Sequence, residues 1–129
     1  MTKRILIFSL AYTPYVGGAE LCVKEITDRF DQNEYSFDMV TLRFDRTLPA
    51  VEKIGNVTVH RIGFTAENVK VSDRALPWQI KLAKFLFPLT AFFKARSLHQ
   101  EKAYDAIWAM MANQAGFGAR FFKYTHPRV

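Results

Sequence analysis

Uncharged apolar runs alternate with amphipathic stretches along this chain. Residues 5–10, ILIFSL, carry no charge, which is typical of a strand buried on both faces of a parallel sheet. From Gly18 the apolar spacing becomes helical, with the recurring positions Ala19, Cys22, Val23, Ile26 and Phe30. We therefore expect a central strand followed by a helix whose apolar face, Cys22 included, lies in the core.

The same patterns predict six further elements. Two strands are expected at residues 36–42 and 57–62, separated by a polar loop over residues 43–56 that ends in the turn signal Gly55-Asn56. A helix from residue 78 to about 102 is expected in one or two pieces, because Pro88 removes a backbone donor. The remaining elements are a strand, a helix capped by Asn113, and a turn leading into a further strand, at residues 104–112, 114–124 and 126–129.

The resulting order, β-α-β-β-α-β-α-β, predicts an α/β fold with a Rossmann-like, mainly parallel open sheet flanked by helices. A length of 129 residues fits one domain. Because the pattern stops at the start of a strand, we expect residues 1–129 to be a partial domain with an exposed apolar sheet edge and poor solubility on its own.

Composition narrows the class of protein. Half of the residues are apolar, which disfavours disorder, and the single cysteine excludes a framework of intrachain disulfides. No signal peptide or membrane-spanning run is visible, so we expect a cytoplasmic location. The net charge of +6 arises after residue 78, since residues 1–78 hold ten basic and ten acidic side chains. This asymmetry favours a local anionic partner surface.

The stretch TPYVGGAEL, residues 13–21, is the strongest candidate for chemistry. Gly17 and Gly18 lie where the first strand hands over to a helix, and glycine permits both a positive φ and close approach of a ligand to the backbone. Free N–H groups at the helix start favour an anion such as a diphosphate. A plain turn is the alternative. Glu20 has two interpretations as well: it complements the helix dipole, or it shapes a sugar or acceptor site.

Two segments resemble one enzyme family in the expected order. Residues 5–26, ILIFSLAYTPYVGGAELCVKEI, resemble the opening of the GT-B glycosyltransferases of family 4, where a first strand ends in a Pro-x-x-Gly-Gly-x-Glu loop. Residues 104–122, YDAIWAMMANQAGFGARFF, resemble the same family's fourth strand and the helix after it. The resemblance covers nearly the whole chain but only the N-terminal, acceptor-side half of such an enzyme, so the C-terminal donor-binding domain would be missing.

The resemblance implies transfer of a sugar from a nucleoside diphosphate sugar, with retention at the anomeric carbon and without a metal or other cofactor. Gly17 and Gly18 match the loop beside the donor diphosphate and the acceptor, and Glu20 matches the acid that closes the motif. Trp108 and Met110 stand where the family often has a His-x-His pair. The implied acceptor is a glycan or a lipid-linked molecule of the cell envelope. The catalytic residues remain unassigned, and the chain alone should be inactive.

The helix expected after residue 78 is both basic and aromatic. Helical spacing places a broad apolar face for packing on the sheet at Trp78, Leu82, Phe85, Leu86, Leu89, Phe92 and Phe93. Phe87 lies nearly opposite, with Lys81, Lys84 and Lys94 as basic neighbours, and could meet an anionic leaflet at the inner face of a membrane. The alternative is a core helix with a solvated basic flank.

Other polar residues give weaker signals. Alternation places His60 as a structural or edge residue of a strand, and His99 and His126 follow no metal-ligand spacing, so we expect no metal site. Asn113 and Gln114 either line the crevice after the fourth strand or cap the helix. The rival function is a non-catalytic α/β module that binds a membrane or a protein through the basic helix. Nucleic-acid binding is disfavoured, because the aromatics do not form a stacking platform on a sheet.

Overall fold

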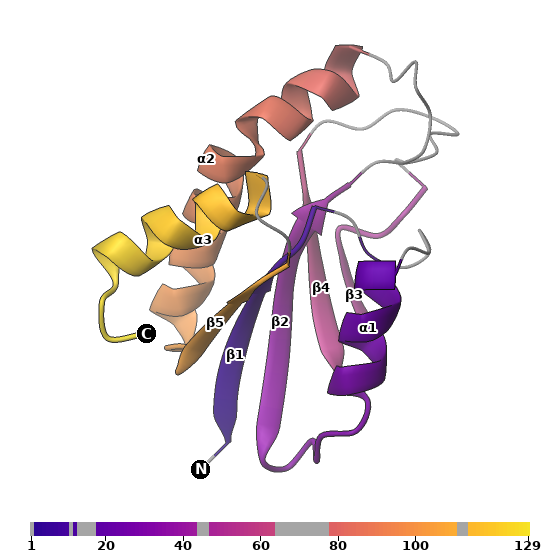
Figure 1. Ribbon diagram of the computed structural model, residues 1–129, viewed down its shortest axis with the longest axis vertical. Helices are drawn as coiled ribbons and strands as arrows, with labels where there is room; N and C mark the ends of the chain where they lie inside the picture. Colours follow the sequence, from indigo (N-terminus) through magenta and orange to yellow (C-terminus); the bar gives the residue numbers. More distant parts are fainter. Residues whose placement is uncertain (1, 11, 13–17, 44–46, 64–77, 111–113) are drawn as a thin grey trace.

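A five-stranded sheet with the order β3-β4-β2-β1-β5 forms the centre of the computed structural model (Figure 1). The structure describes residues 2–10, 12, 18–43, 47–63, 78–110 and 114–129. The strands are β1 Lys3–Phe8, β2 Tyr35–Leu42, β3 Val51–Ile54, β4 Val57–Ile62 and β5 Ala106–Ala109. Every neighbouring pair is parallel except β3 with β4. The predicted mainly parallel open sheet is therefore confirmed.

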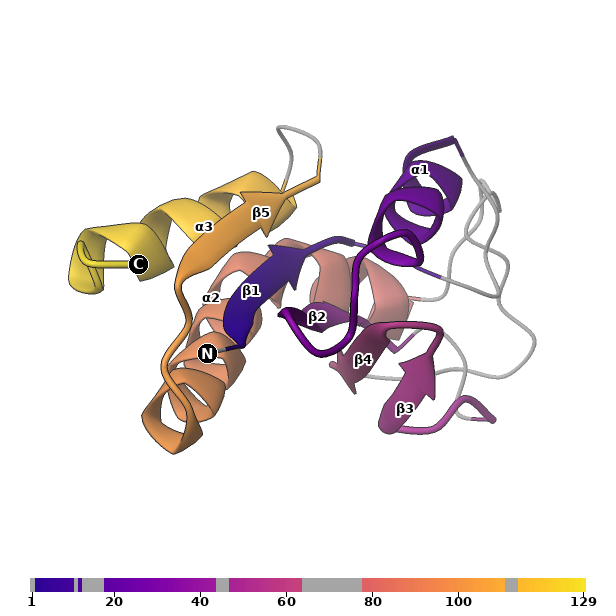
Figure 2. The ribbon, with the colours of Figure 1, turned by 90° about the horizontal axis from the view of Figure 1, so that it is seen from below.

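Helices cover both faces of this sheet (Figure 2). They are α1 Gly18–Thr27, α2 Trp78–Glu101 and α3 Gln114–Thr125. Side chains of β1 alternate between two cores: Ile7 packs with Val23 of α1, whereas Leu6 and Phe8 pack with α2 and α3. Alternation along a strand buried on both faces explains why the β1 sequence is apolar throughout.

One strand was not predicted. β3 lies inside the expected polar loop and pairs with β4 as an antiparallel hairpin around Gly55, whose φ of 57° suits glycine. The amide of Asn56 donates to the carbonyls of Thr27 (2.8 Å) and Phe30 (3.0 Å), which ties the hairpin to the end of α1. At the C-terminus, residues 126–129 form a turn, not the beginning of a strand.

The predicted core face of α1 is partly wrong. Val23 and Thr27 are its buried residues, whereas Cys22 and Ile26 are exposed. Thr27 is tolerated in the core because its hydroxyl donates to the Val23 carbonyl at 2.9 Å. Successive helix residues are about 100° apart, so a face centred on Val23 and Thr27 leaves Cys22 at the solvent side.

The predicted orientation of α2 is inverted. Phe87, expected at the surface, has no exposed area, whereas Phe85, expected on the sheet, is 77% exposed. The buried stripe of α2 consists of Ile80, Ala83, Phe87, Ala91, Ala95 and Leu98. Its alanines let α3 approach closely: a Cβ on Gly118 of α3 would lie 3.5 Å from that of Ala91 and 3.4 Å from the Pro88 carbonyl oxygen. Close packing across small residues therefore outweighs the larger apolar area of the other face.

Pro88 lies inside α2 without dividing it, so the helix runs as one piece of 24 residues. Lys81 is exposed and Lys84 and Lys94 are half-buried, as a basic flank requires. Among the helices of the described residues, none is long and apolar enough to cross a membrane.

The inverted orientation predicts opposite effects at two neighbouring phenylalanines. Phe87→Ala should lower the free energy of unfolding by about 3–5 kcal/mol, because it opens a cavity between α2 and the sheet. Phe85→Ala, the matched control two residues away, should change it by less than about 0.5 kcal/mol. Urea denaturation measures both, and equal losses would contradict the orientation of α2.

Candidate functional site

The candidate site lies where β1 and β5 end side by side. Their register pairs Phe8 with Ala109, and the Met110 amide donates to the Phe8 carbonyl at 2.9 Å. From this point α1 follows β1 on one face of the sheet and α3 follows β5 on the other (Figure 2). Crevices for ligands in open α/β sheets form at this kind of switch point, beyond the carboxyl ends of the strands.

One wall of this point is the start of α1. Gly18 is the first residue of the helix and is exposed, and a Cβ built on it would meet no protein atom within 4 Å. Gly18 does not use the positive φ that glycine permits, because the described glycines with positive φ are Gly55 and Gly63. What Gly18 provides is open space beside its own Cα at the start of the helix, whose first turn has free N–H groups.

Core packing holds α1 against β1 next to this wall. Tyr12 is 2% exposed and packs in the same core as Val23 of α1 and Ile7 of β1. Burial, then the negative charge of Asp28, raises the pKa of Tyr12 to about 12, so this phenol stays neutral. Glu20 lies half-buried in the first turn of α1, as predicted. Gly17 lies outside the described residues.

The other wall is apolar where it is described. Trp108 and Met110 are half-buried and pack against the core on the α1 face. They stand where the family that the sequence resembles often has histidines, and in this chain both side chains extend the core. Gln114 is the first residue of α3, and its side chain lies outside the described part of the chain, as does Asn113. The structure thus leaves both predicted crevice side chains as predictions.

Two arginines near the carboxyl ends of β2 and β4 form hydrogen bonds with β3 and with the segment before it. Arg61 donates to Glu52 Oε2 at 2.7 Å and to the Pro49 carbonyl at 3.0 Å, and its own side chain is buried. Arg43 Nε donates to the Leu48 carbonyl at 2.8 Å. Their hydrogen bonds position the segment before β3.

A buried polar cluster lies under α2, away from the switch point. Asp38 of β2 accepts from Arg4 Nη2 at 3.0 Å and lies 3.1 Å from His60 Nε2, which confirms a structural place for His60. The Arg4 guanidinium also lies 4.5 Å from the centre of the Tyr104 ring. Burial alone would raise the pKa of Asp38, but the contacts with His60 and Tyr104 and the charge of Arg4 outweigh it and lower the pKa. Burial and the Asp38 charge raise the pKa of Tyr104.

Packing of α2 on α3 brings together His99 and His126, which are far apart in the sequence. The rings of His99 and His126 lie 4.8 Å apart, and His99 Nδ1 accepts from the Tyr104 amide at 3.1 Å. Burial, followed by the charges of His126 and Arg4, lowers the pKa of His99. A hollow of about 390 Å³ beside this pair is lined also by Thr125. Within the described residues no three metal-ligating side chains come together, so the pair alone makes no metal centre.

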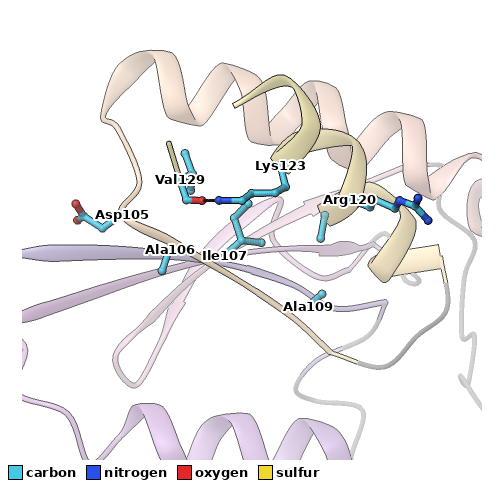
Figure 3. Close-up of a pocket in the computed structure, with 8 residues that line it drawn as sticks. Asp105, Ala106, Ile107, Ala109, Arg120, Lys123 and Val129 are labelled. Atoms are coloured by element: carbon cyan, nitrogen blue, oxygen red, sulfur yellow. Dashed lines mark hydrogen bonds between the residues drawn. The ribbon is translucent and has the colours of Figure 1, made fainter. Parts of the chain in front are cut away.

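A larger hollow of about 520 Å³ runs along the free edge of β5 (Figure 3). Its floor is formed by Ala106, Ile107 and Ala109, and α3 contributes Arg120 and Lys123. The Lys123 ammonium donates to the Val129 carbonyl, which holds the last residue over the hollow. The hollow therefore runs along the sheet edge and reaches Ala109, which pairs with Phe8 at the switch point.

The cluster around Asp38 predicts a pH-dependent stability. Because the pKa of Asp38 is lower in the folded chain, its contribution is complete above the unfolded value of 3.8 and is lost as pH falls through the folded value. Asp38→Asn should cost about 3 kcal/mol near pH 7, since Arg4 loses its carboxylate partner. This cost should shrink below pH 3.8. The exposed Glu34→Gln is the control in denaturant titrations at several pH values, and a pH-independent cost would contradict the ionised cluster.

Comparison with solved structures places this geometry among known folds. A sucrose-phosphate synthase from Thermosynechococcus elongatus is similar, with a TM-score of 0.50 and 17% sequence identity. The match covers 83% of this chain and 27% of that chain, so the chain spans little more than a quarter of its structural neighbour. No protein-family model matches the sequence, and no curated protein does. The fold is a mixed α/β domain similar to a GT-B glycosyltransferase domain.

Proposed function

We propose that this chain forms the N-terminal, acceptor-side domain of a retaining glycosyltransferase that uses a nucleoside diphosphate sugar. The observation that carries the proposal is the start of α1 at Gly18, exposed beside the switch point between β1 and β5, with open space where a side chain would be. The likeness to a glycosyltransferase domain supports the same class of reaction. The donor-binding domain would belong to the remainder of such an enzyme.

Such a sugar transfer requires stabilisation of the diphosphate as it leaves. In the transfer, the bond from the anomeric carbon to the diphosphate oxygen breaks, a bond to the acceptor oxygen forms, and the proton of the acceptor hydroxyl passes to the departing diphosphate or to water. Negative charge therefore develops on the diphosphate. The N–H groups at the start of α1 and the helix dipole are oriented to stabilise such charge without a metal. In this proposal Gly17 and Gly18 admit the diphosphate, and Glu20 accepts a hydrogen bond from a sugar or acceptor hydroxyl.

A graded substitution at Gly18 tests the proposal in the full-length protein. Gly18→Val should lower turnover of UDP- or GDP-sugars at least about tenfold, because its methyl groups would occupy the space assigned to the diphosphate. Gly18→Ala should have a smaller effect. Neither change should destabilise the fold, since no protein atom lies within 4 Å of the added Cβ.

Leu21→Val is the matched control, an exposed position one turn later in α1. Thermal unfolding checks that all three variants fold. Unchanged donor turnover in Gly18→Val would refute the assigned role of the loop.

A non-catalytic module that binds through its helices is the second candidate function. It is favoured by the large aromatic residues that α2 and α3 expose. Absence of turnover or binding with every nucleoside diphosphate sugar tested, by a correctly folded full-length protein, would select this candidate.

A further inference from the structure

α2 has two apolar faces, and the described residues cover one of them. Opposite the buried stripe runs a second one, here named the outer stripe, which consists of Trp78, Leu82, Phe85, Leu89 and Phe93. Spacings of three and four residues keep these side chains in one line along the helix. Trp78 is 69% exposed and Phe93 63%. Exposed apolar area of this extent marks an interaction surface.

α3 repeats the arrangement in the same layer (Figure 2). Phe122 and Ala119 are buried against the sheet and α2, whereas Phe117, Phe121 and Tyr124 are exposed at helical spacing. Both helices on this face of the sheet therefore present aromatic side chains outward, while their opposite sides complete the core.

The charges beside these aromatics have one sign. From Trp78 to Gln100, α2 has no acidic residue, and α3 has none either. The basic residues of these two stretches are Lys81, Lys84, Lys94, Arg96, Arg120 and Lys123. Within the described part of the chain none of the four on α2 forms an ion pair. Their charges are thus available to an anionic partner.

We propose that the outer stripe binds the surface of a bilayer rich in anionic lipids. Tryptophan and phenylalanine would enter the boundary between headgroups and acyl chains, while Lys81 and Arg96, both exposed, would contact lipid phosphates. A second copy of the chain fits this surface less well, because it would bring two basic faces together. Lysine is also depleted in the cores of protein interfaces.

The orientation on a membrane follows from the topology. α2 begins after β4, so its first residue, Trp78, lies towards the carboxyl ends of the strands, as the switch point does (Figure 1). Binding through the outer stripe would therefore place α2 and α3 on the side of the bilayer and α1 on the far face of the sheet. Membrane binding itself does not depend on the proposed sugar transfer.

Vesicle binding by the full-length protein tests the proposal. Co-sedimentation should be strong with vesicles of phosphatidylcholine containing a third phosphatidylglycerol and weak with phosphatidylcholine alone. It should fall in about 1 M salt, where the screening length is about 3 Å. In a Trp108→Phe background, emission of Trp78 should shift to the blue on binding and be quenched by brominated lipid.

Two double variants separate the outer stripe from general surface effects. Phe85→Gln with Phe93→Gln should weaken vesicle binding at least about tenfold, because both side chains are exposed and would lose their apolar contact with lipid. Leu21→Gln with Val51→Gln, which changes apolar residues on α1 and β3 that are each more than half exposed, should change it less than about twofold.

Four results would overturn the proposal: no binding to anionic vesicles, equal binding to neutral vesicles, full binding by the outer-stripe variant, or a dimer that this variant converts to a monomer while vesicles never bind. The assay contains no nucleotide sugar. Vesicle binding without sugar transfer would therefore refute only the proposed function, and sugar transfer without vesicle binding would refute only this inference.

Discussion

The close contact of α2 with the sheet determines most of the other features of the structure. Ile80 and Phe87 fill the space over β1 and β2, and Ala91, about one turn after Phe87, lets α3 pack alongside. Because Phe87 points inward, Phe85 and Phe93 must point outward. Packing of α2 on α3 also brings His99 to His126. The orientation of α2 about its own axis thus determines which of its side chains form the core and which form the candidate binding surface.

The two ends of the sheet serve different purposes. At the carboxyl ends of β1 and β5, Gly18 leaves space where a side chain would be, and the described neighbours Trp108 and Met110 are half-buried apolar residues packed against the core. Near the opposite end, Asp38 accepts a hydrogen bond from Arg4 and lies beside His60. The charges of Asp38 and Arg4 are thus engaged with each other, whereas the first turn of α1 at the switch point has N–H groups without a partner inside the helix.

Local signals in the sequence predicted most of the fold. The uncharged run before residue 10 and the alternation at residues 57–62 were sufficient for β1 and β4, since strand burial follows directly from such patterns. β3 was missed because four residues, two of them charged, give little alternation. The orientation of α2 could not be predicted from apolar area, because the deciding term is shape: Gly118 and Ala91 allow a contact that bulky side chains would prevent. The position of Gly18 was predicted, but Gly17 and Asn113 lie outside the described residues.

The most direct measurement of this account is hydroxyl-radical footprinting of α2 in the full-length protein in solution. It compares oxidation rates of Phe85, Phe87 and Phe93, which share one chemistry and differ in exposure. The structure predicts rapid oxidation of Phe85 and Phe93 and protection of Phe87 until the chain unfolds. Protection of Phe85 together with rapid oxidation of Phe87 would contradict the packing of α2 and remove the surface that depends on it.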